Sequence, residues 1–136
     1  MTIQETQRRI IEEMAAHQSL TDKYAYLIGV GRSLEVTGQS IRREENLLRG
    51  CQSNVWLQVV YRDGKITIRG DSDSLIIKGM IGLLIRVLND RQPGDILDAD
   101  LYFLNETGLN AHLSPARSDG LAAIIGHIRL SVRNAV

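Results

Sequence analysis

The chain has 136 residues, and its 16 lysine and arginine residues balance 16 aspartate and glutamate residues. This length suits a single domain, residues 1–136, that buries a hydrophobic core without disulfides or a structural metal. The balanced charge provides no bulk positive field, which argues against nucleic acid or an anionic membrane as a partner. A single cysteine excludes internal disulfides, and no apolar run follows Met1 that could act as a secretion signal, so the sequence predicts a cytoplasmic protein.

Two helices are predicted at the N-terminus. Thr2 and Glu5 have the spacing of a capping box, and isoleucine and methionine side chains then recur at helical spacing to about His17. Ser19 is suited to cap a second helix, whose apolar spacing continues until glycines interrupt it at about Gly31. The sequence therefore predicts a helical hairpin with one apolar face on each helix.

A small antiparallel sheet of about three strands is predicted next. Residues 46–49 form a short candidate strand, and apolar and polar residues alternate over 55–61 and again over 66–68. The Asp-Gly pair at residues 63–64 is typical of a tight turn between paired strands. We therefore expect a β-hairpin that is preceded by a short extended segment.

A buried helix is predicted after the sheet. Residues 75–89 carry apolar side chains around almost the whole helix circumference, which indicates a central core helix packed on the sheet. Gly79 and Gly82 lie one turn apart within it, and each costs about 1 kcal/mol of helix propensity relative to alanine. We expect the close approach of another backbone to offset this cost.

Further helices complete the chain. Short helices are predicted after Pro93 and Leu101, and a longer C-terminal helix is predicted after the Ser-Pro pair at 114–115. Two helices, a small sheet and then more helices indicate an α+β fold class. No linker is long enough to separate two domains.

The only cysteine lies in a polar break before the predicted hairpin. Cys51 follows Gly50, which frees the backbone, and precedes Gln52 and Ser53, whose side chains can bond local amides. Arg49, two residues upstream, would favour the thiolate, which is the nucleophilic form of cysteine. Most free cysteines are buried and inert, but a structural cysteine prefers apolar neighbours, so this polar setting leaves a reactive thiol and an inert one equally open.

Two other roles for Cys51 stay open on these residues alone. It could be the nucleophile of a cysteine-dependent enzyme, such as a thiol hydrolase, with His112 as the base. It could also simply pack within a non-covalent binding module. A metal site is not predicted, because one cysteine and three scattered histidines show no ligand spacing.

Charged residues further along the chain supply more candidates. Asp71 and Asp73, with Ser72 between them, suit a helix cap and could also meet a basic group of a partner. Arg117 lies in the first turn of the last predicted helix, where the helix dipole disfavours a cation. Residues that break a local rule are often functional, so Arg117 is a candidate functional residue.

Three separated motifs stand out along the chain. They read GCQS and VWL within residues 50–57, GDSD and IIKG within 70–79, and LSP, RS and GL within 113–121. In order and in approximate spacing these motifs resemble the SufE family of sulfur acceptors, and together they span essentially the whole chain. The resemblance implies a SufE-like or IscU-like fold, with a small antiparallel sheet and helices on one side.

The resemblance also implies a sulfur carrier that activates a cysteine desulfurase. Cys51 would accept sulfane sulfur from the persulfide of a SufS-type desulfurase and pass it to an iron-sulfur scaffold of the SufBCD type. Persulfide transfer needs one activated thiol and no cofactor, whereas a cluster scaffold typically needs several cysteine ligands. The sequence therefore predicts no cofactor for this protein, and it leaves open whether the protein forms a homodimer.

The resemblance assigns roles to the remaining candidates. Arg49 and Arg117 are expected to favour the Cys51 thiolate or its persulfide, and His112 is a further candidate for that neighbourhood. A second group is expected to shape the loop or to contact the partner: Gly50, Gln52, Ser53, Asp71 and Asp73.

Overall fold

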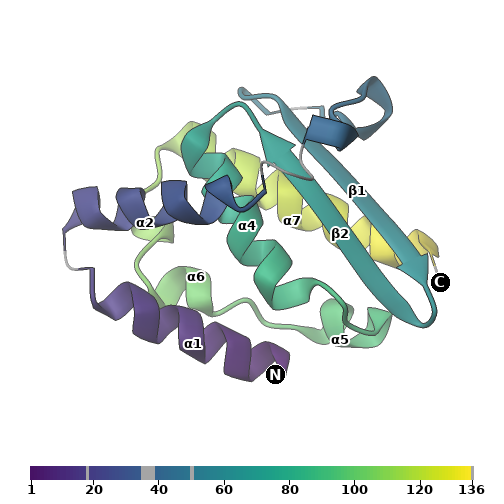
Figure 1. Cartoon of the computed structure of the whole chain (residues 1–136), viewed down its shortest axis with the longest axis horizontal. Helices are drawn as coiled ribbons and strands as arrows, with labels where there is room; N and C mark the ends of the chain where they lie inside the picture. Colours follow the sequence, from purple (N-terminus) through teal and green to yellow (C-terminus); the bar gives the residue numbers. More distant parts are fainter. Residues whose placement is uncertain (18, 35–38, 50, 136) are drawn as a thin grey trace.

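Helices cover one face of a two-stranded β-hairpin in this computed structural model, which describes residues 1–17, 19–34, 39–49 and 51–135 (Figure 1). The helices are α1 (Ile3–Ala15), α2 (Leu20–Arg32), α4 (Leu75–Leu88), α5 (Pro93–Asp98), α6 (Phe103–Glu106) and α7 (Pro115–Ala135). The strands are β1 (Val55–Arg62) and β2 (Lys65–Ser72). Short 3-10 turns form η1 (Gln39–Ile41), η2 (Glu44–Asn46) and η3 (Asn110–His112). The predicted α+β class is confirmed.

The N-terminal helical hairpin forms as its capping residues predict. Thr2 Oγ1 accepts a hydrogen bond from Glu5 N (3.0 Å), and Glu5 Oε1 accepts one from Thr2 N (3.0 Å), so the capping box is complete. Ser19 caps α2 by accepting from Asp22 N (3.1 Å). Helix α2 then runs through both of its glycines to Arg32, further than the sequence pattern predicts.

The two strands pair as an antiparallel hairpin around the Asp-Gly turn. Asp63 and Gly64 both have positive φ, 53° and 81°, as a two-residue turn between twisted strands requires. The predicted third strand is not formed as a strand among the described residues. Asn46 ends η2, and only Leu47 pairs with Trp56 as an isolated bridge. Too few residues separate the end of η2 from the loop that carries Cys51 to form a third strand.

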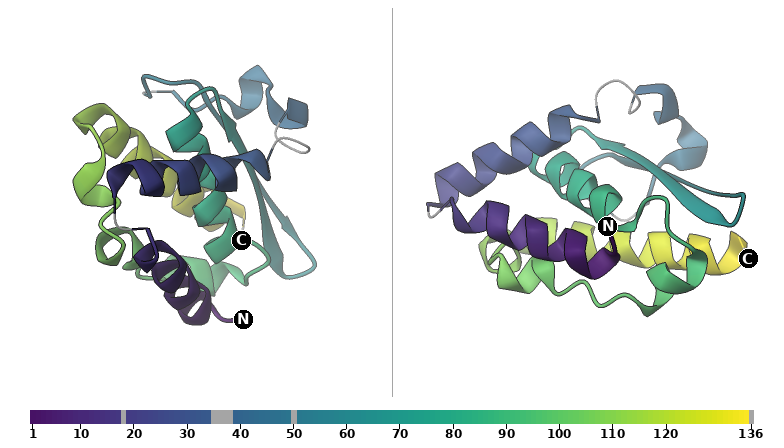
Figure 2. Two further views of the ribbon diagram at one scale, coloured as in Figure 1. Left: turned by 60° about the vertical axis from the view of Figure 1, so that its left-hand side comes forward. Right: turned by 60° about the horizontal axis from the view of Figure 1, so that its bottom comes forward.

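Helix α4 lies at the centre of the fold. It contacts β2, α1, α2 and α7, and α7 also packs against β1 (Figure 2). A Cβ atom built on Gly79 would lie 2.8 Å from Leu27 Cβ and closer still to the Leu27 carbonyl, and one on Gly82 would lie 2.7 Å from Val30 Cγ1. The expected close approach of another backbone is therefore confirmed, and α2 provides it.

Hydrogen bonds at the surface join α1, α2 and α4. Glu13 of α1 accepts a hydrogen bond from Tyr26 of α2 (3.0 Å) and two from Arg86 of α4 (2.9 and 2.6 Å). Burial together with the neighbouring Glu13 raises the pKa of Tyr26 to about 12. Below them, one cluster of buried apolar side chains extends from Ile3 to Val132.

Candidate functional site

The segment that carries Cys51 is held at its start by β1. Leu47 forms the bridge with Trp56, and Leu48 N donates a hydrogen bond to Val55 O (2.8 Å). The chain therefore turns back on itself between Leu48 and Val55, and Cys51 lies within this loop.

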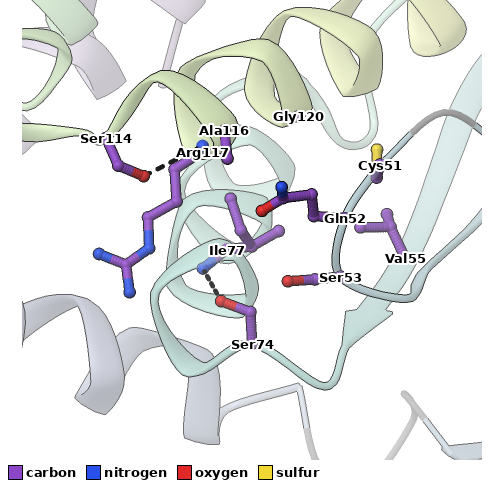
Figure 3. A pocket seen from close by; sticks show the side chains of 10 residues that line it. All are labelled: Cys51, Gln52, Ser53, Val55, Ser74, Ile77, Ser114, Ala116, Arg117 and Gly120. Atoms are coloured by element: carbon purple, nitrogen blue, oxygen red, sulfur yellow. Dashed lines mark hydrogen bonds between the residues drawn. The ribbon is translucent and has the colours of Figure 1, made fainter.

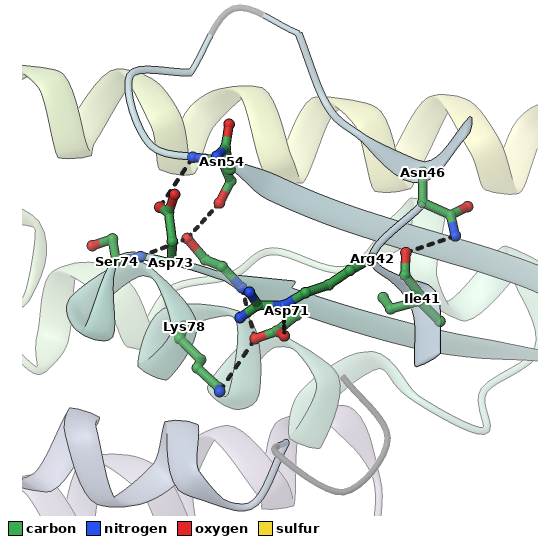
Figure 4. A network of polar contacts seen from close by, with 9 residues as sticks. Ile41, Arg42, Asn46, Asn54, Asp71, Asp73, Ser74 and Lys78 are labelled. Atoms are coloured by element: carbon green, nitrogen blue, oxygen red, sulfur yellow. Dashed lines mark hydrogen bonds and ion pairs between the residues drawn. The ribbon is translucent and has the colours of Figure 1, made fainter. Parts of the chain in front are cut away.

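The end of the same loop is fixed to the end of β2. Asn54 N donates to Asp73 Oδ1 (3.1 Å), and Asn54 O accepts from Ser72 Oγ (2.8 Å) and from Asp73 N (3.3 Å) (Figure 4). Both backbone groups of Asn54 are thus bonded. The loop around Cys51 is short and is supported on both sides by paired backbone.

A pocket of about 370 Å³ opens beside the thiol (Figure 3). Its walls come from the cysteine loop, from the first turn of α4 and from the first two turns of α7. The lining residues are Cys51, Gln52, Ser53, Val55, Ser74, Ile77, Ser114, Ala116, Arg117 and Gly120. Three segments that are distant in sequence therefore meet at this site.

The two helices that line the pocket both begin with a serine cap. Ser74 Oγ accepts a hydrogen bond from Ile77 N (3.4 Å), and Ser114 Oγ accepts one from Arg117 N (3.3 Å). Each hydroxyl uses its oxygen as an acceptor in the cap, so its O–H can still donate toward the pocket. Helix N-termini also carry partial positive charge, which favours an anion such as a thiolate.

The resting thiol is nevertheless biased toward its protonated form. Cys51 is half-buried, it packs against the hydrophobic core, and this burial raises the pKa of its thiol. Arg117 lines the same pocket, and its guanidinium lies 5.9 Å from the centre of the Tyr24 ring. Burial is what shifts the pKa of Cys51 in this structure, and activation of the thiolate by neighbouring arginines stays a prediction.

Only some of the other residues predicted around Cys51 line its pocket. Gln52 and Ser53 line the pocket, as a role in shaping the loop requires. Arg49 instead pairs with Glu44 (3.5 Å), and both side chains are largely exposed. Gly50 and the side chain of His112 lie outside the described residues, while the His112 backbone ends η3, two residues before Ser114.

Neither Asp71 nor Asp73 caps α4, and the two residues do not form a common surface for a partner. Asp71 is fully buried, so it offers no surface to a partner in this structure. Asp73 is exposed and holds Asn54, as described above. The cap of α4 is Ser74, because β2 continues to Ser72 and the helix begins only at Leu75. The prediction of a cap at Asp71–Asp73 is therefore wrong by one to three positions.

Several site residues were not singled out from the sequence. Ser74, Ile77 and Ala116 line the pocket, and Arg42 contacts the buried Asp71. The only local signal was that serines before apolar helical runs act as caps and so lie at helix starts. Which helix starts meet in space depends on the tertiary fold, so the pattern alone could not place them together.

Among the residues that the structure describes, no three His, Cys, Asp or Glu side chains are grouped so that they could hold a metal ion. No helix within the described ranges is long and apolar enough to cross a membrane.

The fold and the pocket define a class of protein in which an α+β scaffold presents one thiol where two helices begin. The family described as "SufE: Fe-S metabolism associated domain" matches residues 8–132. This match spans most of the chain, and the chain belongs to the SufE family.

A curated relative and a solved structure agree with this assignment. The chain is 33% identical over 125 residues to the "Cysteine desulfuration protein SufE" of Wigglesworthia glossinidia brevipalpis, which covers 90% of this chain and 87% of that protein. The solution structure of a hypothetical protein from Thermus thermophilus is similar with a TM-score of 0.77, over 96% of this chain and 95% of that one. The sequence identity to that structure is 19%, so it supports the fold alone.

Proposed function

We propose that this protein accepts sulfane sulfur on Cys51 from a cysteine desulfurase and delivers it to iron-sulfur cluster assembly. The observation that carries the proposal is a single half-buried thiol beside a pocket in a chain of the SufE family. The donor that fits best is a SufS-type desulfurase, and the receiver is a scaffold of the SufBCD type. Both would be met in the cytoplasm.

The transfer step needs only the thiol that the chain supplies. The Cys51 thiolate attacks the outer sulfur of the persulfide on the donor cysteine. A new S–S bond forms on Cys51 Sγ, the S–S bond on the donor breaks, and the donor cysteine leaves as a thiolate. No net oxidation occurs and no second thiol of this chain takes part.

The pocket supports the transfer by stabilising negative charge on sulfur. The Ser74 and Ser114 hydroxyls can donate hydrogen bonds, and Arg117 supplies a full positive charge at the same pocket. A thiolate or a terminal persulfide sulfur that moves into the pocket would gain these contacts. Gln52 and Ser53, with Gly50, would then shape the loop and contact the donor.

Burial of the resting thiol suits a carrier that waits for its donor. The raised pKa keeps Cys51 protonated and poorly nucleophilic between transfers. Docking of the donor would release the loop, while Asn54 and Leu48 remain anchored on the hairpin. The change would therefore be confined to the few residues around Cys51.

The experiment that tests the proposal combines the protein with a SufS-type desulfurase and L-cysteine. Mass spectrometry of the intact chain should show one added sulfur atom, which a reductant removes. Cysteine turnover by the desulfurase should rise at least about tenfold, because this protein clears the persulfide product. A tenfold rise corresponds to about 1.4 kcal/mol of activation free energy. Cys51→Ser should lose both the adduct and the stimulation.

Two outcomes contradict the proposal. Wild-type protein that gains no sulfur and leaves desulfurase turnover unchanged is not a carrier for that enzyme class. A Cys51→Ser variant that keeps full stimulation would assign Cys51 to packing. Circular dichroism of the variant, which should match that of the wild type, separates loss of the thiol from loss of the fold.

A further inference from the structure

Arg42 is fixed in one orientation by contacts on three sides. Its Nε donates to Asp71 Oδ2 (2.7 Å) (Figure 4). Its guanidinium lies 4.7 Å from the centre of the Trp56 ring, and its backbone N donates to Gln39 O (3.2 Å). The residue before it, Ile41, is buried. Both the backbone and the side chain of Arg42 are therefore held in place before any partner arrives.

The carboxylate that holds Arg42 is itself rigid. Asp71 is fully buried, accepts a hydrogen bond from Ser72 N (2.8 Å) and lies 3.3 Å from Lys78 Nζ, where Lys78 is also buried. One carboxylate thus faces two cations, and the cluster of Arg42, Asp71 and Lys78 carries a net positive charge. The single carboxylate cannot neutralise both cations, so the cluster keeps an excess positive charge.

Within residues 1–17, 19–34, 39–49 and 51–135, most of the hydrogen-bonding capacity of Arg42 has no acceptor. A guanidinium has five N–H donors, and among the described residues only Nε has a hydrogen-bond acceptor. The side chain is 36% exposed. By contrast, the neighbouring Arg43 and Arg49 each have their own carboxylate, Glu45 (3.8 Å) and Glu44 (3.5 Å). Arg42 is therefore the arginine of residues 39–49 that is held in position and has donors without an acceptor among the described residues.

We propose that Arg42 is a preformed receptor for a carboxylate side chain on the protein that donates sulfur to Cys51. A partner aspartate or glutamate accepts two hydrogen bonds from Nη1 and Nη2, a bidentate arrangement that remains possible while Nε bonds Asp71. Asp71 and Trp56 act as positioning residues, because they hold the guanidinium without contacting the partner. This inference rests on the proposed function and names one point of contact for the donor.

The position of Arg42 relative to Cys51 supports the same partner for both. Arg42 lies over Trp56, the second residue of β1, and pairs with Asp71, which is opposite Trp56 on β2. Arg42 is therefore at the end of the hairpin where Asn54 and Asp73 anchor the Cys51 loop. The side chains of Trp56 and of the pocket residue Val55 project to opposite faces of β1. A standard protein interface buries about 800 Å² per partner, which corresponds to a patch about 16 Å in radius, so a donor that docks over the Cys51 loop and this end of the hairpin can reach Arg42. Because the guanidinium is already ordered, binding loses little side-chain entropy.

The test measures desulfurase turnover against the concentration of this protein for the wild type, Arg42→Gln, Arg42→Lys and the matched control Arg43→Gln. Arg42→Gln should raise the KM for this protein about tenfold and leave the maximal turnover unchanged, because the lost contact is a docking contact. Arg42→Lys should recover only part of the affinity, because lysine cannot bind bidentately. In the wild type KM should rise with salt, and this dependence should be weaker in Arg42→Gln.

The alkylation rate of Cys51 in the free protein separates docking from support of the loop. It should be the same in the wild type, Arg42→Gln and Arg43→Gln. The inference is overturned if Arg42→Gln leaves KM unchanged, if Arg43→Gln raises it equally, or if Arg42→Gln accelerates alkylation in parallel with KM. In each of these cases, stimulation of the desulfurase by the wild-type protein would still support sulfur transfer. If the wild-type protein gave no stimulation, the proposed function itself would be contradicted.

Discussion

At the scale of single residues, Cys51 combines a reactive group with an environment that suppresses it. Its loop is polar in sequence, yet the thiol is half-buried against the core, and burial raises its pKa. Arg49, the expected activator, is engaged with Glu44. We therefore expect the thiol to be protected in the free protein, with its reactivity increased by a change in the loop.

This protection predicts slow alkylation of Cys51 in the free protein. At neutral pH, iodoacetamide should modify Cys51 at least about tenfold more slowly than a free cysteine peptide, because a raised pKa reduces the thiolate fraction and burial restricts access. The rate should keep rising with pH beyond the ordinary thiol pKa of about 8.5. Mass spectrometry of timed samples measures it. Alkylation as fast as that of the peptide would show that the loop does not shelter the thiol.

At the scale of secondary-structure elements, the crossing of α2 and α4 determines where the pocket forms. Gly79 and Gly82 allow the backbones of the two helices to touch. Helix α4 in turn packs on β2, and its first turn provides Ser74 and Ile77 to the pocket. A change in this crossing would therefore shift one wall of the site.

Substitution of Gly79 tests the importance of this crossing. Gly79→Ala should lower the free energy of unfolding by about 2–3 kcal/mol, because the new methyl group has to displace the backbone of Leu27. Gly126 of α7 has no atom within 4 Å of its built Cβ, so Gly126→Ala should instead stabilise the protein by about 0.5–1 kcal/mol. Urea unfolding of both variants measures the difference. Equal effects of the two substitutions would show that the close approach is not a constraint.

At the scale of the whole molecule, a chain with no net charge keeps a charged cluster in its interior. Burial would raise the pKa of Asp71, but hydrogen bonds from Arg42, Ser72 N and Lys78 together hold it below its ordinary value. A carboxyl whose folded-state pKa is lowered contributes stability that is fully present above its unfolded pKa. That contribution is lost as the pH falls through the folded-state pKa.

The acid stability of the protein should therefore depend on Asp71. The wild type should lose stability as the pH falls below about 4, the ordinary pKa of aspartate. Asp71→Asn should be less stable by about 3 kcal/mol at neutral pH, because Lys78 is left buried without its counter-ion, and its stability should fall less steeply with acid. Glu45→Gln removes an exposed ion pair and should change stability by less than about 1 kcal/mol. An Asp71→Asn variant with the wild-type acid profile would contradict this assignment.

The parts of the fold that the sequence predicts well are those with local causes. The capping box at Thr2, the turn at Gly64 and the Ser-Pro start of α7 each depend on residues within one turn of one another. The apolar side chains around almost the whole circumference predict the buried α4. The family motifs predict Cys51 as the centre of the site, and Arg117 lies at the same pocket.

The parts that the sequence misses depend on distant contacts. Residues 46–49 have the composition of a strand but form only the bridge at Leu47. Asp71 looks like a surface cap residue because nothing near it in sequence shows that Lys78 and Arg42 will enclose it. Arg42 itself has no unusual local pattern. Its fixed orientation arises only when η1 packs on the sheet.

The residues that line the pocket lie far apart in the sequence, which matters while the protein is being synthesised. Ser114 and Arg117, which form one wall, follow Cys51 by roughly 60 residues, and synthesis at about 5–20 residues per second takes about 3–12 s to cover that distance. During this interval Cys51 has been made but α7 has not, so the thiol lacks the covering helix. We therefore expect the nascent chain to be more open than the folded protein to oxidation or to a mixed disulfide at Cys51.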